Sequence, residues 1–282
     1  MEQPLVSVIM GVYNADHKLL TTAVNSILSQ TYKNFEFIIC DDASNNGTSE
    51  WLAEYAKKDK RIRVILNATN QRLAGTLNRC IAAAKGTYLA RQDDDDFSDP
   101  QRLEKQVAFL EANPDVDFVG SNCCLYNSND GIFGQRQMPE KPDKNSFLFN
   151  SPFIHGSLMF RSTCLNTDMC YAVTRWTKRT EDYEMFMRMY SHGLRGANLQ
   201  ENLYCYHYGT EQRHIAMHYR VDEMVLRYRG FRSMGLLPKG LPYVVKPIVL
   251  GMMPESLVCT LREKFALYSH HSLSTEREFY FC

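Results

Sequence analysis

Residues 86–96 read Gly86-Thr87-Tyr88-Leu89-Ala90-Arg91-Gln92-Asp93-Asp94-Asp95-Asp96, a strand-like run that ends in four consecutive aspartates. Four adjacent carboxylates repel one another, so we expect a positive charge to offset them. A divalent cation such as Mg²⁺ or Mn²⁺ is suited to this role because it prefers oxygen ligands. Carboxylates at a strand end also lie where open α/β sheets bind ligands. The alternative is a solvated acidic turn, since the residues up to Pro100 also favour a turn and a helix start.

Strand and helix patterns alternate on both sides of this stretch. The expected strands lie at residues 5–12, 35–40, 62–66, 87–90 and 116–122, and the expected helices at residues 14–30, 45–58, 73–84 and 100–111. Such alternation predicts an α/β fold with a mostly parallel central sheet and helices on both faces. Right-handed crossovers bring the carboxyl ends of parallel strands to one edge. Polar clusters follow three of the strands, at Tyr13-Asn14, Asp41-Asp42 and Asp93–Asp96, so we expect one site at that edge.

The pattern becomes less regular after residue 122. Residues 127–142 favour a loop, residues 154–160 a strand, and residues 181–192 a helix with an acidic first turn. Beyond about residue 212 the chain turns helical and basic, which predicts a boundary there.

The composition argues against several classes of protein. Lys plus Arg equals Asp plus Glu, at 32 each, which argues against a nucleic-acid partner because such proteins usually carry a basic domain. The nine cysteines are odd in number and form no Cys-x-x-Cys pair, and no charged-then-apolar segment opens the chain. We therefore expect reduced thiols, used mainly in packing, in a cytoplasmic protein. No stretch approaches the roughly 20 apolar residues of a membrane-spanning helix.

A nucleotide-sugar donor would need three kinds of side chain, and the clusters offer candidates. The nucleobase needs stacking and polar contacts, the diphosphate needs a cation, and the acceptor hydroxyl needs a base. Asp42 is placed to accept a hydrogen bond from a base N–H; the alternative is that Asp42 or Ser44 caps the next helix. Tyr13 is suited to stack on a base, or else it packs in the interior. Arg72 is suited to a base or a phosphate, or else it is a surface residue.

Two further candidates come from the second half of the chain. Asp182 opens a helix in Thr180-Glu181-Asp182-Tyr183-Glu184, where a carboxylate is stabilised as the anion. It suits a general base, and a plain capping box is the alternative. His207, within Tyr204-Cys205-Tyr206-His207-Tyr208, is either a metal ligand or a structural histidine.

Taken together, these segments resemble the family 2 glycosyltransferases, which have the GT-A fold, over residues 4–210. The resemblance is to the type that builds bacterial surface polysaccharides and lipopolysaccharides. It is carried by four ordered motifs: Ser26-Ile27-Leu28-Ser29-Gln30-Thr31-Tyr32 is similar to "SILxQTY", Asp41-Asp42-Ala43-Ser44 to "DDGS" with Ala in place of Gly, Tyr88–Asp96 to "YIARxDADD", and Glu181-Asp182-Tyr183-Glu184 to "EDYEL".

The resemblance implies a metal-dependent inverting glycosyltransferase. It would move a sugar from a nucleotide-sugar, expected to be a UDP-sugar, to a hydroxyl of a saccharide or lipid-linked acceptor in surface glycan biosynthesis. The implied roles are general base for Asp182; nucleotide-sugar binding for Tyr13, Asp42, Arg72, Asp93 and Asp94; and binding of Mn²⁺ or Mg²⁺ by Asp95, with Asp93 and His207. Cys205 stands where the family's Tyr-Arg-x-His region has Arg, so His207 matches that region only in part. Asp96 is assigned to the turn into the helix at Pro100.

Two other functions fit the sequence less well. A sugar nucleotidyltransferase normally has a Gly-rich loop with Arg and Lys after its first strand, and Gly11-Val12-Tyr13-Asn14 is not such a loop. A non-catalytic nucleotide-binding protein is expected to lose one of the acidic positions, and all are present here.

The resemblance also divides the chain. Residues 1–212 would form the catalytic domain, with a nucleotide-binding half at 1–122 and an acceptor-binding half at 123–212. Residues 213–282 would form a helical extension, both basic and apolar. The extension is either an interfacial anchor on the inner face of the plasma membrane, near a lipid-linked acceptor, or a helical subdomain packed on the sheet or a partner chain. The chain lacks a Q-x-x-R-W motif, which favours a non-processive enzyme.

Overall fold

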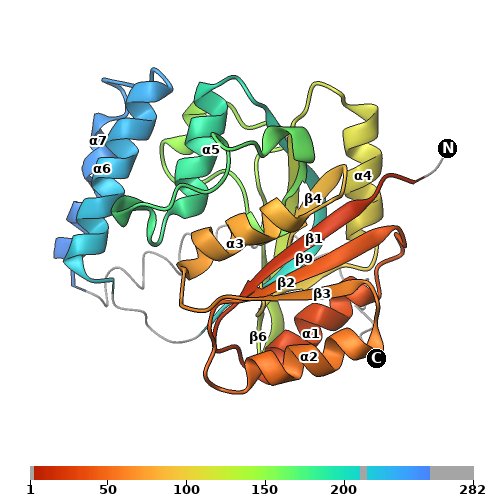
Figure 1. Ribbon diagram of the computed structural model, residues 1–282. Coiled ribbons are helices and arrows are strands. Elements are labelled where there is room, and N and C mark those ends of the chain that lie inside the picture. The colour runs from red at the N-terminus through yellow and green to blue at the C-terminus, as the bar shows by residue number, and fades with distance from the viewer. Residues whose placement is uncertain (1–2, 210–214, 255–282) are drawn as a thin grey trace.

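The computed structural model describes residues 3–209 and 215–254, and within these ranges a nine-stranded sheet forms the centre of the molecule (Figure 1). Its strands are β1 (Val6–Val12), β2 (Phe35–Asp41), β3 (Ile62–Leu66), β4 (Tyr88–Arg91), β5 (Phe97–Ser98), β6 (Phe118–Asn127), β7 (Gly131–Arg136), β8 (Met159–Arg161) and β9 (Gly196–His207). Their order is β3-β2-β1-β4-β8-β6-β9-β5, with β7 paired to β6.

The helices connect and cover these strands. They are α1 (His17–Leu28), α2 (Thr48–Lys58), α3 (Arg72–Ala83), α4 (Arg102–Ala112), α5 (Glu181–Ser191), α6 (Met217–Ser233) and α7 (Leu241–Met252). Strands β3, β2, β1 and β4 are mutually parallel, and one helix lies between each pair of strands in the sequence. The predicted α/β fold with a mostly parallel sheet is confirmed. Strands β5, β7 and β8 pair in the antiparallel direction, and the sequence patterns did not predict this pairing.

Side chains of β1 alternate between two separate cores, as the two-residue period of a strand requires. Ile9 packs in the core that contains α3 and α5. Val6, Val8 and Met10 pack in the core that contains α1, α2 and α4. Because each face of the sheet is buried under helices, the strand reads as an almost continuous apolar run. This arrangement confirms the prediction of helices on both faces.

Residues 127–142 are a loop only in part: residues 137–142 contain neither helix nor strand, but β7 turns back at residues 131–136 and pairs with β6. The polar residues that suggested a loop form the turn of this hairpin. Asn127 Oδ1 accepts hydrogen bonds from the backbone N–H groups of Asn129 and Asp130 at 2.9 and 2.7 Å. Gly131 completes the turn with φ of 70°, a conformation that favours glycine.

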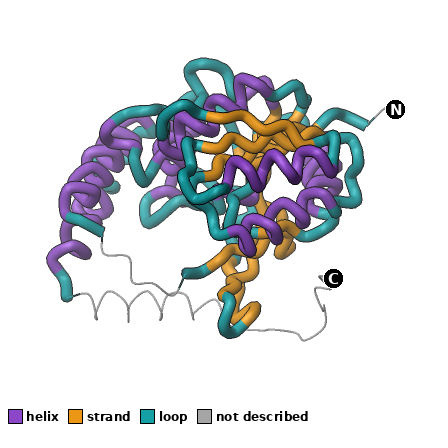
Figure 2. Tube along the Cα trace, turned by 60° about the horizontal axis from the view of Figure 1, so that its bottom comes forward, coloured by secondary structure: helices purple, strands orange, loops and turns teal. Residues whose placement is uncertain are grey.

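Helices α6 and α7 form a hairpin that lies on α5 at one side of the sheet (Figures 1 and 2). Phe231 of α6 is fully buried in the core that α3 and α5 share with the sheet. Arg227 is buried too; it pairs with Glu223 and donates to the carbonyl of Leu148 at 3.2 Å. The described part of the expected extension therefore packs as a helical hairpin, while residues 255–282 lie outside the described residues. In the two described ranges, every helix is too short or too polar to cross a bilayer.

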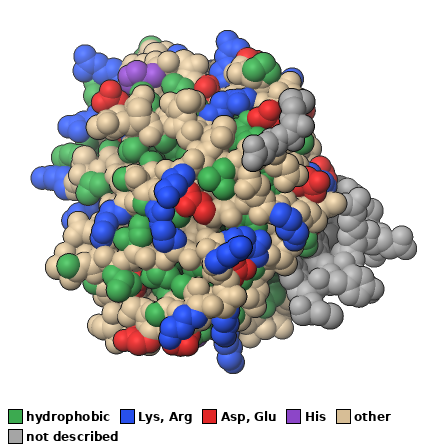
Figure 3. Space-filling view, turned by 45° about the vertical axis from the view of Figure 1, so that its right-hand side comes forward, with side chains coloured by type: hydrophobic (Ala, Val, Ile, Leu, Met, Phe, Trp, Pro, Cys, Tyr) green, Lys and Arg blue, Asp and Glu red, His purple; other side chains and the backbone are tan. Residues whose placement is uncertain are grey.

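The cysteines and the surface charges of the described residues agree with the expectations drawn from the composition. The seven cysteines in the described ranges are all free, and six of them are buried, which confirms their expected use in packing there. The remaining two, Cys259 and Cys282, lie outside the described residues. On the face shown in Figure 3, acidic side chains lie among the basic ones, as expected for a chain with no net charge.

Candidate active site

Three polar loops meet at one edge of the sheet because their strands are parallel neighbours. β1 pairs with β2 on one side and with β4 on the other, in parallel register. The residues that follow these strands, Tyr13, Asp42 and Asp93, therefore lie beyond the same edge. The structure thus places the first three predicted clusters where an open α/β sheet binds ligands.

Backbone strain gathers at this edge. Three non-glycine residues of the described ranges have positive φ: Asn14 at 50°, Ala43 at 63° and Arg72 at 62°. Each follows one of the strands β1, β2 and β3, and each such conformation costs on the order of 1–3 kcal/mol. Strain of this kind is maintained mainly at functional sites. The φ of Ala43 also gives a physical reason for the glycine that the resembling motif has at this position.

Asp42 is buried and held from two sides. Its Oδ1 accepts hydrogen bonds from Asn67 Nδ2 at 2.6 Å and from the backbone N–H of Gln71 at 2.7 Å. The helix-capping alternative is wrong, because α2 is capped by Gly47 without any side-chain bond. Ser44 instead donates its hydroxyl to Asp41 Oδ1 at 2.5 Å. Asp42 therefore has a fixed orientation, and its Oδ2 atom takes no part in these two hydrogen bonds.

Tyr13 and Arg72 both reach solvent beside this carboxylate edge. Tyr13 is 50% exposed, so it is not the interior residue that the alternative interpretation proposed. Arg72 is exposed at the start of α3, where its backbone N–H donates to Asn70 Oδ1 at 3.1 Å. Neither side chain is committed to the core.

The four aspartates differ in their surroundings. Asp93 forms an ion pair with the guanidinium of Arg91, which is 1% exposed. Burial, followed by the negative charges of Asp95 and Asp93, raises the pKa of Asp94 to about 7. Burial and the charge of Asp93 also raise the pKa of Asp95, while the nearby His207 opposes this shift. The run therefore carries more negative charge than Arg91 offsets.

Asp96 has a structural role, but a different one from the predicted role in the turn before α4. Its Oδ1 accepts a hydrogen bond from the backbone N–H of His207 at 2.6 Å. The turn into α4 is served by Asp99, which accepts from the backbone N–H of Gln101 at 2.8 Å. The assignment of Asp96 to that turn is wrong, because β5 pairs with β9 and so brings the end of β9 against Asp96.

His207 ends β9 beside the aspartate run. Its Nδ1 lies 3.8 Å from Asp95 Oδ2. In the described ranges, no group of three or more His, Cys, Asp or Glu side chains is arranged to hold a metal ion by itself. Nucleotide sites commonly bind Mg²⁺ with one or two carboxylates and take the other ligands from phosphates and water. The surplus carboxylates and the Asp95–His207 pair fit a divalent cation held in that way.

A second acidic pair opens α5. Burial raises the pKa of Asp182 to about 6, with a further contribution from Asp93, although the backbone N–H of Tyr183 opposes the shift. Burial and the charge of Asp182 raise the pKa of Glu181 to about 7. The capping-box alternative is wrong, because Thr180 at the helix start makes no side-chain cap bond. A carboxylate with a pKa near 6 suits proton abstraction at neutral pH.

Three residues that the sequence did not single out lie near these acidic groups: His155, Gly156 and Tyr171. His155 Nε2 lies 2.6 Å from the hydroxyl of Tyr171. Burial, then the charge of Arg91, lowers the pKa of His155 to about 3, so its imidazole is neutral. Gly156 packs so tightly that an added Cβ would overlap the Tyr204 hydroxyl and lie 2.6 Å from Asp93 Oδ2. No periodic pattern in the sequence marks these three positions. The only hint in the sequence is Arg91, because a charged residue in an apolar strand needs polar partners elsewhere in the fold.

Comparisons with known proteins agree with this geometry. The model of the family "Glycosyl transferase family 2" matches residues 7–186. The chain is 40% identical over 263 residues to the putative glycosyltransferase EpsE of Bacillus subtilis, covering 93% of this chain and 94% of that protein. It is 34% identical over 150 residues to the Escherichia coli UDP-Glc:alpha-D-GlcNAc-diphosphoundecaprenol beta-1,3-glucosyltransferase WfgD, covering 53% and 57% of the two chains.

Two solved structures share the fold. TarS 1–349 of S. aureus in complex with UDP-GlcNAc superposes with a TM-score of 0.66 and 18% identity, covering 86% of this chain and 72% of that one. The mannosyltransferase PcManGT of Pyrobaculum calidifontis, in complex with GDP-Man and Mn²⁺, gives 0.60 and 18%, covering 95% and 82%. At such identities the likeness concerns the GT-A fold alone. The extent of the family match and the identity to EpsE show that this chain belongs to glycosyl transferase family 2 and is a glycosyltransferase.

Proposed function

We propose that the protein is a metal-dependent inverting glycosyltransferase of surface glycan biosynthesis. It takes a sugar from a nucleotide-sugar, most simply a UDP-sugar, and transfers it to a hydroxyl of a saccharide or lipid-linked acceptor. The names of relatives support this proposal, since WfgD uses UDP-Glc and a diphosphoundecaprenol-linked sugar. The structures with UDP-GlcNAc and with GDP-Man and Mn²⁺ support a nucleotide-sugar donor and a divalent cation.

One observation carries the proposal: the aspartate run and the α5 carboxylates share an electrostatic environment. Burial is the main cause of the raised pKa of Asp182; Asp93 raises this pKa further and Arg91 lowers it, so both groups act on the same carboxyl. The run ends β4 and Asp182 opens α5, so the fold brings together two acidic groups that are far apart in the sequence. A donor held at the first group therefore lies next to a base at the second.

In the donor half of the site, each loop contacts a different part of the nucleotide-sugar. Tyr13 stacks on the nucleobase, and Asp42 accepts a base N–H through the oxygen that its structural bonds leave out. Arg72 lies at the start of α3, where its charge suits the diphosphate. Asp93 and Asp94 contact the ribose and the sugar side of the donor. These roles use groups that the strained loops already hold in place.

Asp95 holds the divalent cation, with His207 and Asp93 beside it. When bound, Mn²⁺ or Mg²⁺ neutralises the diphosphate as it leaves. Burial and then the charge of Asp93 raise the pKa of Asp95, and a bound cation would stabilise its carboxylate form.

Asp182 takes the proton of the acceptor hydroxyl. As the hydroxyl oxygen forms a bond to the anomeric carbon, the bond from that carbon to the diphosphate oxygen breaks, and its electron pair leaves with the diphosphate. The proton moves to the Asp182 carboxylate. A single displacement of this kind inverts the anomeric configuration. Neutral His155 does not compete for the proton, because its pKa lies near 3.

A donor and acceptor screen tests the proposal. The purified protein would be incubated with several nucleotide-sugars, with Mn²⁺ or Mg²⁺ or with a chelator, and with saccharide and diphospholipid-linked acceptors. We expect release of nucleoside diphosphate together with a glycosylated product, only in the presence of the metal. Formation of a nucleotide-sugar from a nucleoside triphosphate and a sugar phosphate would instead show a nucleotidyltransferase. Donor binding without either reaction would show a non-catalytic protein.

A further inference from the structure

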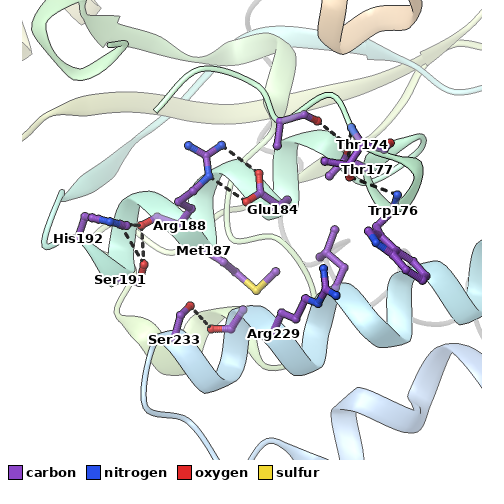
Figure 4. Close-up of a pocket in the computed structure, with 13 residues that line it drawn as sticks. Thr174, Trp176, Thr177, Glu184, Met187, Arg188, Ser191, His192, Arg229 and Ser233 are labelled. Atoms are coloured by element: carbon purple, nitrogen blue, oxygen red, sulfur yellow. Dashed lines mark hydrogen bonds and ion pairs between the residues drawn. The ribbon is translucent and has the colours of Figure 1, made fainter. Parts of the chain in front are cut away.

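A groove runs between α5, α6 and the segment that precedes α5 (Figure 4). It has a volume of about 330 Å³, and it lies outside the donor site. Trp176 stands at one end and His192 at the other, while Met187 and Arg229 project into the space between them. The preceding segment contains the short helix η4 (Arg175–Thr177). The groove is therefore built from the same elements that position Asp182.

The floor of the groove is apolar and closely packed. Met187 of α5 and Leu226 of α6 both line it. Gly230 lets the two helices approach, since an added Cβ would overlap the sulfur of Met187. Glu184 and Arg188 form an ion pair on one wall, with Nε and Oε1 separated by 2.9 Å, so their charges are already neutralised. The floor thus suits a hydrocarbon group rather than a second charged one.

The Trp176 end is strongly cationic. The guanidinium carbon of Arg175 lies 3.9 Å from the centre of the indole ring, and that of Arg229 lies 5.5 Å from it. Lys178 and Arg179 are exposed in the same segment. Within the described part of the chain, none of these four cations forms an ion pair with a carboxylate. Two guanidinium groups on one ring repel each other, and a phosphate is the anion that matches their geometry.

This cationic end adjoins the proposed base. The Thr180 hydroxyl donates to the carbonyl oxygen of Trp176 at 3.5 Å, only two residues before Asp182. Glu184 lines the groove, and residues two apart face opposite sides of a helix. The groove and the Asp182 carboxylate are thus separated by the first turn of α5, and a helix with side chains is about 10 Å across. One sugar with an attached diphosphate is of comparable length.

We propose that this groove, lined by Trp176, Arg229, Met187 and Leu226 and flanked by Arg175, whose guanidinium lies over Trp176, binds the phosphate-bearing end of the acceptor. The inference rests on the proposed function and adds the class of acceptor, a saccharide joined through a diphosphate to an apolar carrier. Arg175 and Arg229 contact the phosphate oxygens, Trp176 packs on the first sugar, and the apolar floor receives the start of the carrier. The reacting hydroxyl then reaches Asp182 around the start of α5.

The outer helix of the hairpin supports a lipid as the carrier. On α7, Leu241, Val245 and Val249 are 47%, 48% and 53% exposed and recur every four residues, so they form one apolar stripe. Helix α7 contains Lys246 and no acidic residue. Figures 1 and 2 show α7 on the outer side of α6, away from the sheet. An apolar stripe on a helix with a basic and no acidic side chain is the arrangement expected near the headgroups of an anionic membrane.

The double variant Arg175→Gln/Arg229→Gln tests the site. Initial rates would be measured with three acceptors that share one saccharide: a diphosphate with a short prenyl chain, a diphosphate with a methyl group, and an uncharged alkyl glycoside. We expect the variant to raise the KM for the prenyl diphosphate by about tenfold or more, because charge-assisted hydrogen bonds to phosphate are strong. The KM for the alkyl glycoside and for the donor should stay within about twofold. The matched control, Lys60→Gln/Arg195→Gln, removes two exposed charges elsewhere and should match the parent with all three acceptors.

Each other outcome is also decisive. An unchanged KM for the prenyl diphosphate, in an active and folded variant, would overturn the phosphate site. An equal rise for the alkyl glycoside would do so too, because it would show a loss unrelated to phosphate. If the parent enzyme used the methyl and prenyl diphosphates equally well, and Met187→Asn reduced neither, the lipid part of the proposal would be wrong. A parent protein that transferred sugar to none of the acceptors would instead contradict the proposed function itself.

Discussion

His207 donates its backbone N–H to Asp96 Oδ1 at 2.6 Å, and this bond ties the last residue of β9 to the end of the aspartate run. The tie also brings the imidazole of His207 to 3.8 Å from Asp95 Oδ2. A residue from the second half of the chain thereby joins the carboxylates that follow β4. The aspartates consequently have two kinds of role: Asp96 holds β9 in place through its hydrogen bond, and Asp95 stays available to bind a ligand.

Replacement of Asp95 should weaken metal-dependent donor binding. In Asp95→Ala the proposed cation loses its main protein ligand, so the Mn²⁺ concentration needed for donor binding should rise at least about tenfold, in line with the loss of one charged contact. Titration calorimetry of the nucleotide-sugar at several Mn²⁺ concentrations would measure this. Asp115→Ala, which removes a 71% exposed carboxylate, is the control. Donor binding that depended on Mn²⁺ as in the parent protein would remove Asp95 from the ligand set.

Gly156→Ala should disturb the donor side of the site without removing any charged group. The added methyl group would lie 2.6 Å from Asp93 Oδ2 and overlap the Tyr204 hydroxyl, both within a buried region. We expect a loss of about 1–3 kcal/mol in the free energy of unfolding, as for other overpacked sites, together with weaker donor binding. Denaturant unfolding and donor titration would measure the two effects. Gly209→Ala is the control, because nothing lies within 4 Å of its added Cβ. Equal behaviour of the two variants would show that the close packing at Gly156 is unimportant.

Ala43→Gly should stabilise the protein. Ala43 has φ of 63°, where glycine avoids a steric cost of about 1–2 kcal/mol but loses more backbone entropy on folding. The expected net gain in the free energy of unfolding is about 0.5–1 kcal/mol. Ala53→Gly, on the exposed side of α2, should change the stability in the opposite direction by a similar amount. A loss of stability in both variants would contradict the strain assigned to Ala43.

Sugar transfer should increase with pH through about pH 6 to 7. The pKa of Asp182 is raised to about 6 and that of Glu181 to about 7, mainly by burial, and the two carboxyl groups titrate as a pair. Because a general base must be deprotonated, activity is present above these values and lost as the pH falls through them. Rates at saturating donor and metal between pH 5 and 9 would measure the profile. A profile that is flat down to pH 5 would contradict a base with a raised pKa.

The sequence predicted the donor half of the molecule well because its signals are local. Strands β1 and β2 are apolar throughout, as strands buried on both faces must be. The polar residues that follow each strand then occupy one edge as a consequence of parallel connection. Even the strain at Ala43 has a sequence counterpart, since it stands where the resembling motif has glycine.

The second half was less predictable because its structure depends on long-range pairing. Strand β9 contains Gln200, Glu201 and Asn202 and pairs with β6 through irregular register, so its sequence lacks a simple alternation. The contact of His155 with Tyr171, and the effect of the Asp93 charge on Asp182, arise only when separate loops fold together. Asp182 was identified from a family resemblance, and its raised pKa follows from burial that no local pattern reveals.

The most direct test of the account is the rate of sugar transfer by Asp182→Asn. The asparagine keeps the size of the side chain but cannot accept the proton, so we expect transfer to fall by roughly 10²–10⁴-fold, the usual contribution of a general base. Metal-dependent donor binding should stay at the parent level, because the aspartate run is intact. Asp115→Asn should transfer at the parent rate. A folded Asp182→Asn protein that also transferred sugar at the parent rate would show that Asp182 is not the base, and that the site must work through another group.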